Sequence, residues 1–210
     1  MPGRANLAPH ILLQETGVPY RLALVDFETE AQRGSEYLTL NPNGRVPTLV
    51  DDDFVIYEAA AITMYLADKY GKARLAPAPE TKSRGRYYQW MTHLTNSVQE
   101  ALNQWFHPDH FVSGACVEKA FKRNAEKRLE TLWTNLDDTL SGSPYLLGES
   151  YSACDAYLFF LTCWQTRLKK SMIRERSNLA KFFETVAQRP AVRRALKCEG
   201  ITSWYSLVDD

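Results

Sequence analysis

The chain has 210 residues, of which 45% are hydrophobic, and its 25 basic residues balance 25 acidic ones. That length allows one large domain or two small ones with an ample core. Zero formal net charge gives no electrostatic reason to expect a nucleic acid or an anionic membrane as partner. No apolar run is as long as a membrane span, and the four cysteines form no CxxC pair. Together with a start that lacks a signal-peptide pattern, these features predict a protein of the reducing cytoplasm.

The first forty residues predict one helix and one strand. The chain opens on a turn, Pro2-Gly3, and the pattern from Leu7 to Thr16 is helical until Gly17 ends it. The segment Tyr20–Asp26 alternates weakly between apolar and polar residues, which predicts a strand. The polar segment 27–40 is expected to be irregular or to hold one helical turn.

The most informative stretch is 41–71. It begins with Asn-Pro and Asn-Gly pairs, which favour tight turns. Two short runs, Thr48–Val50 and Phe54–Tyr57, flank three aspartates and predict a β-hairpin. From Glu58 the apolar residues recur every three or four positions, which predicts a helix that ends at Gly71.

Two features of this stretch predict a small peptide ligand. Pro47 has no N–H to donate, and a cis Val46–Pro47 bond would turn the N–H and C=O of Val46 outward, toward an extended peptide. Glu58 and Ala59 begin a helix, where free N–H groups attract a carboxylate, while the Glu58 side chain can hold an ammonium group. An amino-acid-like head satisfies both demands. The plainer alternative is a hairpin followed by a helix-capping glutamate.

Beyond a proline-containing linker at 72–82 the pattern is helical throughout. One apolar stripe runs from Tyr87 to Trp105, where Pro108 follows and breaks the helix. A second stripe runs from Val117 to Leu140. We therefore expect two long amphipathic helices.

A third, nearly all-apolar helix is expected from Ala156 to Trp164. Ser152 and Asp155 precede it with the spacing of a capping box, which fixes where such a helix begins. His107 and His110 lie three residues apart, but Pro108 breaks the helix there and we identify no third ligand near them in sequence. We therefore expect no metal site.

The central stretch resembles the thioredoxin-like half of the cytosolic glutathione S-transferases. That family shows NP-x-G-x-VP-x-L, a hairpin, and then Glu-Ser or Glu-Ala opening a helix. The matching positions here are Asn41, Pro42, Gly44, Val46, Pro47, Leu49, Glu58 and Ala59. The Ser152/Asp155 pair matches the capping box of the same family's helical domain. The resemblance covers nearly the whole chain and is greatest to bacterial, beta-class-like members.

The resemblance implies an α/β thioredoxin-like domain at 1–71, a linker at 72–82 and an all-α helical domain at 83–210. It implies a glutathione S-transferase, a cytoplasmic homodimer that acts in detoxification. Glutathione would be the co-substrate and a small hydrophobic electrophile the acceptor. Neither a metal nor a nucleic acid nor a membrane is expected as partner.

The resemblance also assigns roles to particular residues. Glutathione would be held by Arg45, the backbone of Val46, Glu58 and the backbone of Ala59. Asn6 would donate a hydrogen bond to the thiolate, and Trp164 would line the electrophile pocket. Plainer alternatives remain, because Asn6 can be a helix cap, Arg45 a solvated arginine and Trp164 a core residue.

Two departures from the family favour a different function. Bacterial members resembling this chain read PG-x-C-x-LAPH near the start, and here Ala5 takes the cysteine position. The strand that precedes the Pro-Gly turn in the family is also missing, so we expect either a longer natural protein or a reduced, weaker sheet. Both departures suit the alternative, a glutathione S-transferase-fold binding or structural protein with little or no transferase activity.

Overall fold

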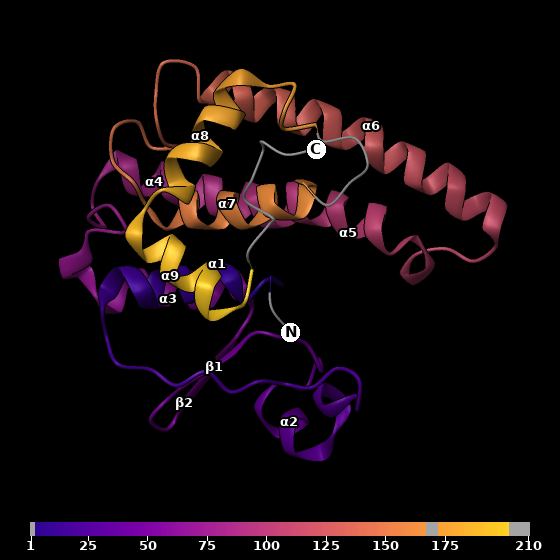
Figure 1. Cartoon of the computed structure of the whole chain (residues 1–210), viewed down its shortest axis with the longest axis horizontal. Coiled ribbons are helices and arrows are strands. Elements are labelled where there is room, and N and C mark those ends of the chain that lie inside the picture. The colour runs from indigo at the N-terminus through magenta and orange to yellow at the C-terminus, as the bar shows by residue number, and fades with distance from the viewer. Residues whose placement is uncertain (1–2, 167–171, 202–210) are drawn as a thin grey trace.

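A computed structural model describes residues 3–166 and 172–201, so Pro2 of the expected opening turn lies outside the described residues. Figure 1 shows a small hairpin and α2 at one end and the long helices stacked at the other. The helices are α1 (Leu7–Thr16), α2 (Ser35–Leu40), α3 (Ala59–Lys69), α4 (Lys82–His93), α5 (Glu100–Phe106), α6 (Ala115–Thr139), α7 (Ala153–Thr166), α8 (Ser177–Ala187) and α9 (Pro190–Cys198). The strands are β1 (Thr48–Asp51) and β2 (Phe54–Tyr57). Within the described ranges, no helix combines the length and the apolar run needed to cross a bilayer.

The predicted hairpin is confirmed, with β1 and β2 antiparallel and Leu49 opposite Ile56. Its turn places Asp52 at φ 55°, a left-handed conformation that Asp tolerates better than most residues. Asp51 fastens the hairpin to α3, because its carboxylate accepts hydrogen bonds from the Tyr65 hydroxyl (2.5 Å) and the Lys69 ammonium group. The sheet therefore sits against the helix whose start is the candidate ligand site.

The predicted strand at Tyr20–Asp26 is wrong. Residues 18–26 run without regular structure, and within the described part of the chain the sheet consists of β1 and β2 alone. A strand exists only through hydrogen bonds to a neighbour, and no described residue supplies that ladder here. As a result Leu22 and Leu24 are 53% and 79% exposed. The segment 27–40, expected to be irregular or to hold one helical turn, contains a 3₁₀ turn at Ala31–Arg33 and the short helix α2.

The core is centred on α7, which explains why this helix is apolar all round. Its residues 153–163 are buried completely or nearly so. The Cys154 thiol donates to the Tyr87 carbonyl of α4 (3.3 Å), and Gln165 accepts from the Trp133 indole of α6 (3.0 Å). Helices from both sides thus pack on α7.

The predicted capping pair at the start of α7 is present, with one difference. The Asp155 carboxylate accepts from the Ser152 N–H (2.8 Å), as a capping box requires. The Ser152 hydroxyl, however, donates to the same carboxylate (2.9 Å) instead of accepting from a helix N–H. Asp155 does most of the capping.

The first long apolar stripe forms one continuous helical run that ends at Phe106, close to the predicted break at Pro108. A π-helical segment, Leu94–Gln99, lies between α4 and α5. Such segments widen the helix by one residue per turn and often mark functional sites. Here the segment ends at Gln99, whose side chain accepts from the Tyr157 hydroxyl of α7 at 2.5 Å.

Candidate functional site

The loop before β1 presents Val46 to a ligand. The Val46–Pro47 peptide is cis, as predicted. The loop is held from behind, because the Arg45 carbonyl accepts from the Asn41 amide (2.6 Å) and the Tyr37 hydroxyl (2.8 Å). Within the described residues, the N–H and C=O of Val46 have no hydrogen-bond partner. The Arg45 side chain is exposed, so it extends from a fixed backbone into solvent.

Glu58 begins α3 in an unusual conformation. Its φ is 70° and its ψ 113°, which costs free energy for any residue with a side chain and marks a candidate functional position. Its carboxylate makes no capping hydrogen bond and is exposed, while Ala59 is buried. The free N–H groups of the first turn and the Glu58 carboxylate therefore stand side by side, one able to bind an anion and the other a cation.

Glu58 also faces the helical part of the molecule. Burial raises the pKa of Tyr157 on α7, and the negative charge of Glu58 raises it further. Tyr157 is held by its hydrogen bond to Gln99. The carboxylate thus lies near the polar end of a buried tyrosine from the other half of the chain.

Asn6 lies in the turn before α1, and its side chain contacts the far end of the chain. Its amide nitrogen donates to Glu199 (3.0 Å), and no side-chain capping bond is present, so the helix-cap alternative is wrong. Its Oδ1 is buried and has no partner within the described residues. One amide hydrogen of Asn6 remains for another acceptor.

Glu199 is the residue that sequence reasoning missed. It follows α9, its side chain is 5% exposed, and its carboxylate also accepts from the Gly3 N–H (2.7 Å) and contacts His10 Nδ1 (2.7 Å). No local pattern indicates this role, since the partners are nearly two hundred positions away in sequence. Only the fold brings them together.

Trp164 reaches the same N-terminal turn from α7. Its indole N–H donates to the Gly3 carbonyl (2.9 Å), and its ring packs edge-on against Phe106 at 6.2 Å between centroids. The side chain is half-buried. The structure thus places Trp164 beside the turn that carries Asn6, in contact with both halves of the molecule.

One face of α7 links these groups. Tyr157, Phe160 and Trp164 follow each other at helical spacing, with edge-on ring contacts at 5.5 and 4.7 Å. Seven residues of helix span about 10 Å. Glu58 lies near one end of this aromatic row, and Gly3, bonded to Trp164, lies at the other. No hydrogen bond or ion pair between described residues joins the Arg45–Val46 loop to Asn6.

Comparisons with known proteins identify the family of this chain. The family model for the glutathione S-transferase N-terminal domain matches residues 1–68, and that for the C-terminal domain matches residues 102–190. Glutathione S-transferase GST-4.5 of Xanthomonas campestris pv. campestris is 30% identical over 200 residues, which cover 95% of this chain and 97% of that protein.

Two solved structures show the same fold. The bacterial beta-class glutathione S-transferase of Sphingomonas chungbukensis has 33% identity and a TM-score of 0.83, covering 96% of this chain and 97% of its own. A sphingomonad glutathione S-transferase complexed with glutathione has 32% identity and a TM-score of 0.82, and the match likewise covers 96% of this chain and 97% of that one. This chain therefore belongs to the glutathione S-transferase family, with a thioredoxin-like N-terminal domain that holds a small sheet and a helical C-terminal domain.

Proposed function

We propose that this protein is a glutathione S-transferase that joins the glutathione thiolate to small hydrophobic electrophiles. The observation that carries the proposal is a set of groups, unpaired within the described part of the chain, at one end of the hairpin, where Thr48 pairs with Tyr57. The N–H and C=O of Val46 lie just before β1, and the exposed Glu58 carboxylate lies just after β2 beside the free N–H groups of α3. Together they match the backbone, carboxylate and ammonium group of a small tripeptide such as glutathione.

The residues supply the roles that such a tripeptide requires. The N–H groups at the start of α3 hold the amino-terminal carboxylate and Glu58 holds the ammonium group. The free backbone of Val46 pairs with the peptide backbone, as an added strand would. Arg45 pairs with the carboxylate at the other end of the ligand.

At the thiol, a nearby donor or positive charge is needed to favour the reactive thiolate. The remaining amide hydrogen of Asn6 donates to it, and the charge of Arg4 adds positive potential. The thiolate then attacks an electrophile held beside Trp164.

Membership of the glutathione S-transferase family further suggests a cytoplasmic homodimer with a detoxifying role. Light scattering behind a sizing column tests the dimer.

Two observations bear on the second candidate, a binding or structural protein. Ala5 supplies no thiol, and the Asn6 amide already donates to Glu199, so the turn offers fewer groups to activate glutathione than the family's pattern does. Such a protein would keep the Glu58 end of the site and lose turnover.

Retention on immobilised glutathione, together with turnover of a chloronitrobenzene acceptor, separates the two candidates. The transferase is retained and turns over. Glu58→Gln removes the charge that faces the ammonium group and raises the KM for glutathione by about 10- to 100-fold, the value of one charge-assisted hydrogen bond. Asn6→Ala lowers kcat with little change in KM. Glu36→Gln, an acidic residue in the first turn of α2, is the matched control and changes neither.

The outcomes are distinct. Retention without turnover supports the binding protein. Loss of retention in the wild-type protein contradicts both candidates, because both need the site at Glu58.

A further inference from the structure

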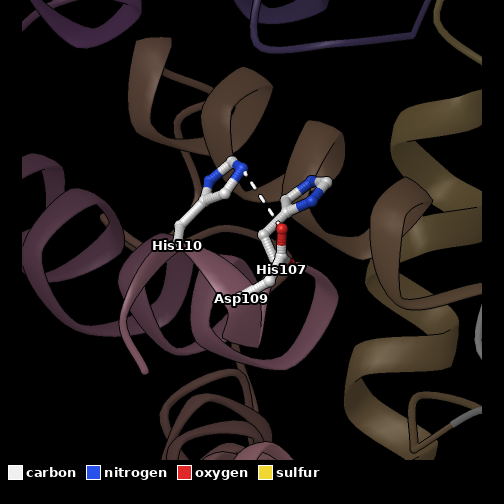
Figure 2. A group of neighbouring side chains, drawn as sticks. All are labelled: His107, Asp109 and His110. Carbon is white, nitrogen blue, oxygen red and sulfur yellow. Dashed lines mark ion pairs between the residues drawn. The ribbon is translucent and has the colours of Figure 1, made fainter. Parts of the chain in front are cut away.

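A cluster of three potential metal ligands lies between α5 and α6, apart from the residues assigned above to glutathione. Figure 2 shows His107, Asp109 and His110 gathered on one short turn. One donor atom from each residue can be chosen so that all lie within 4.8 Å of one another. Asp109 and His110 are 65% and 61% exposed, and His107 is half-buried.

The backbone itself holds the cluster together. Pro108 begins a 3₁₀ turn, Pro108–His110, and the His110 N–H donates to the His107 carbonyl at 3.1 Å. With three residues per turn, side chains at i and i+3 lie directly above one another. The two imidazoles are accordingly stacked, with centroids 5.0 Å apart and planes 12° from parallel. Pro108 therefore begins the turn that brings His107 and His110 side by side.

The three side chains leave room for an ion between them. His110 Nε2 lies 3.8 Å from the nearer Asp109 carboxylate oxygen, too far for a hydrogen bond. Donors on a tetrahedral zinc ion, bound at about 2.0–2.2 Å, lie about 3.4 Å from one another. Closing the remaining gap of about 1.4 Å also requires one imidazole to rotate, because the lone pairs of two nearly parallel rings do not converge on one ion. His110 is exposed enough to make this rotation.

The chemistry of the donors selects the class of ion. Two imidazoles and one carboxylate suit Zn²⁺ and related transition ions, whereas Mg²⁺ and Ca²⁺ prefer oxygen ligands only. The charged groups around His107 include both positive and negative ones, so they have opposite effects on its pKa and on a bound cation. Burial and the charges of His110 and Arg4 lower the pKa of His107, while Asp109 opposes them. The same Arg4 repels a bound cation, and the Asp109 carboxylate offsets it.

We propose that His107, Asp109 and His110 bind a divalent transition-metal ion of the Zn²⁺ class, with a further coordination position open to solvent. This revises the expectation of no metal, which took Pro108 as an obstacle and overlooked the aspartate between the histidines. The ion would be bound by His107, which directly follows Phe106. The ring of Phe106 packs on Trp164, so the ion would lie at the margin of the proposed acceptor pocket. The proposal stands whether or not the protein is a transferase.

Calorimetric titration with Zn²⁺ tests the site in the untagged, chelator-treated full chain without glutathione, whose thiol itself binds zinc. Exposed Cys116 and Cys198 are replaced by serine throughout, because free thiols also hold zinc. We expect saturable binding of one Zn²⁺ per chain. Asp109→Asn weakens it by at least about tenfold, and His110→Gln abolishes it. The control His93→Gln, in α4, leaves it unchanged.

Circular dichroism confirms that each variant is folded, which is expected because Asp109 and His110 are exposed. With Co²⁺ as probe, the absorption spectrum should lack the charge-transfer band of a thiolate ligand. The proposal is overturned if the protein without its two exposed thiols, Cys116 and Cys198, shows no saturable binding of Zn²⁺. It is equally overturned if binding survives both Asp109→Asn and His110→Gln.

Discussion

Asp155 shows how one buried carboxyl fixes the start of the central helix. It is fully buried and accepts from the N–H groups of Leu146 and Ser152, both at 2.8 Å. Burial raises its pKa to about 6, although these hydrogen bonds oppose the shift. Sequence spacing predicted the bond to Ser152. The bond to Leu146 was not predictable, because it depends on the path of an irregular loop.

The raised pKa predicts a pH-dependent contribution to stability. Because the folded pKa exceeds the ordinary 3.8, the contribution of Asp155 is fully present below that pH and is lost as the pH rises through about 6. A shift of about two units corresponds to about 3 kcal/mol. The free energy of unfolding of wild type, minus that of Asp155→Asn, should therefore fall by up to about 3 kcal/mol between pH 4 and pH 7.

Urea titrations at several pH values measure this difference, and other titrating groups cancel in the comparison. Asp138→Asn, which changes an exposed aspartate near the end of α6, is the matched control for the substitution itself. A flat profile for Asp155→Asn would mean that Asp155 titrates normally.

At the scale of elements, the predictions succeeded where structure is encoded locally. The helices α1, α6 and α7 follow from apolar periodicity and from their end signals, such as Gly17 after α1. The strand at Tyr20–Asp26 failed because pairing depends on a neighbour, which no local pattern reveals. Helix α2 was anticipated only as a helical turn somewhere in 27–40, because it is short and has no buried residue to give it a period.

The join between α3 and α4 depends on one buried arginine. Arg84 binds both carboxylate oxygens of Asp68, at 2.7 and 2.6 Å, and also donates to the Pro77 carbonyl at 2.9 Å. It therefore links the end of the thioredoxin-like part, the connecting segment and the first long helix. This fork has Nη2 on both oxygens of Asp68 and Nη1 on Pro77, a spread of donors that a planar guanidinium provides and a single ammonium nitrogen does not.

Arg84→Lys should accordingly destabilise the protein by about 2–3 kcal/mol, since charge-assisted bonds are lost and the partly buried Pro77 carbonyl loses its donor. Chemical unfolding measures the loss. Arg86→Lys changes the same residue type two positions later on the exposed face, and should stay within about 0.5 kcal/mol of wild type. Equal stability of the two variants would show that the Arg84 fork contributes no more than a surface contact.

In the whole molecule, the last described helix is tied to the first. Helix α9 runs antiparallel to α1, and a hydrogen bond at each end joins the two. Arg189, before α9, donates to Glu15 near the end of α1 (2.7 Å). Glu199, after α9, accepts from the N–H of Gly3 before α1 (2.7 Å). Figure 1 shows the two helices side by side. The C-terminal part of the chain thereby positions the turn that carries Asn6, although sequence reasoning assigned the two to separate domains.

This arrangement predicts that Glu199→Gln loosens α1 selectively. The amide cannot replace a carboxylate that serves Gly3, Asn6 and His10 together, so we expect a loss of about 3 kcal/mol and a Tm lower by roughly 6–12 °C. Native-state hydrogen exchange should show amides of α1 losing protection while those of α7, packed at the centre of the core, keep theirs. Glu184→Gln, on the exposed side of α8, should alter neither Tm nor exchange. If α1 and α7 lost protection equally, the two helices would open only together, as one cooperative unit. Glu199 would then stabilise the whole fold and would not specifically hold the turn at Asn6.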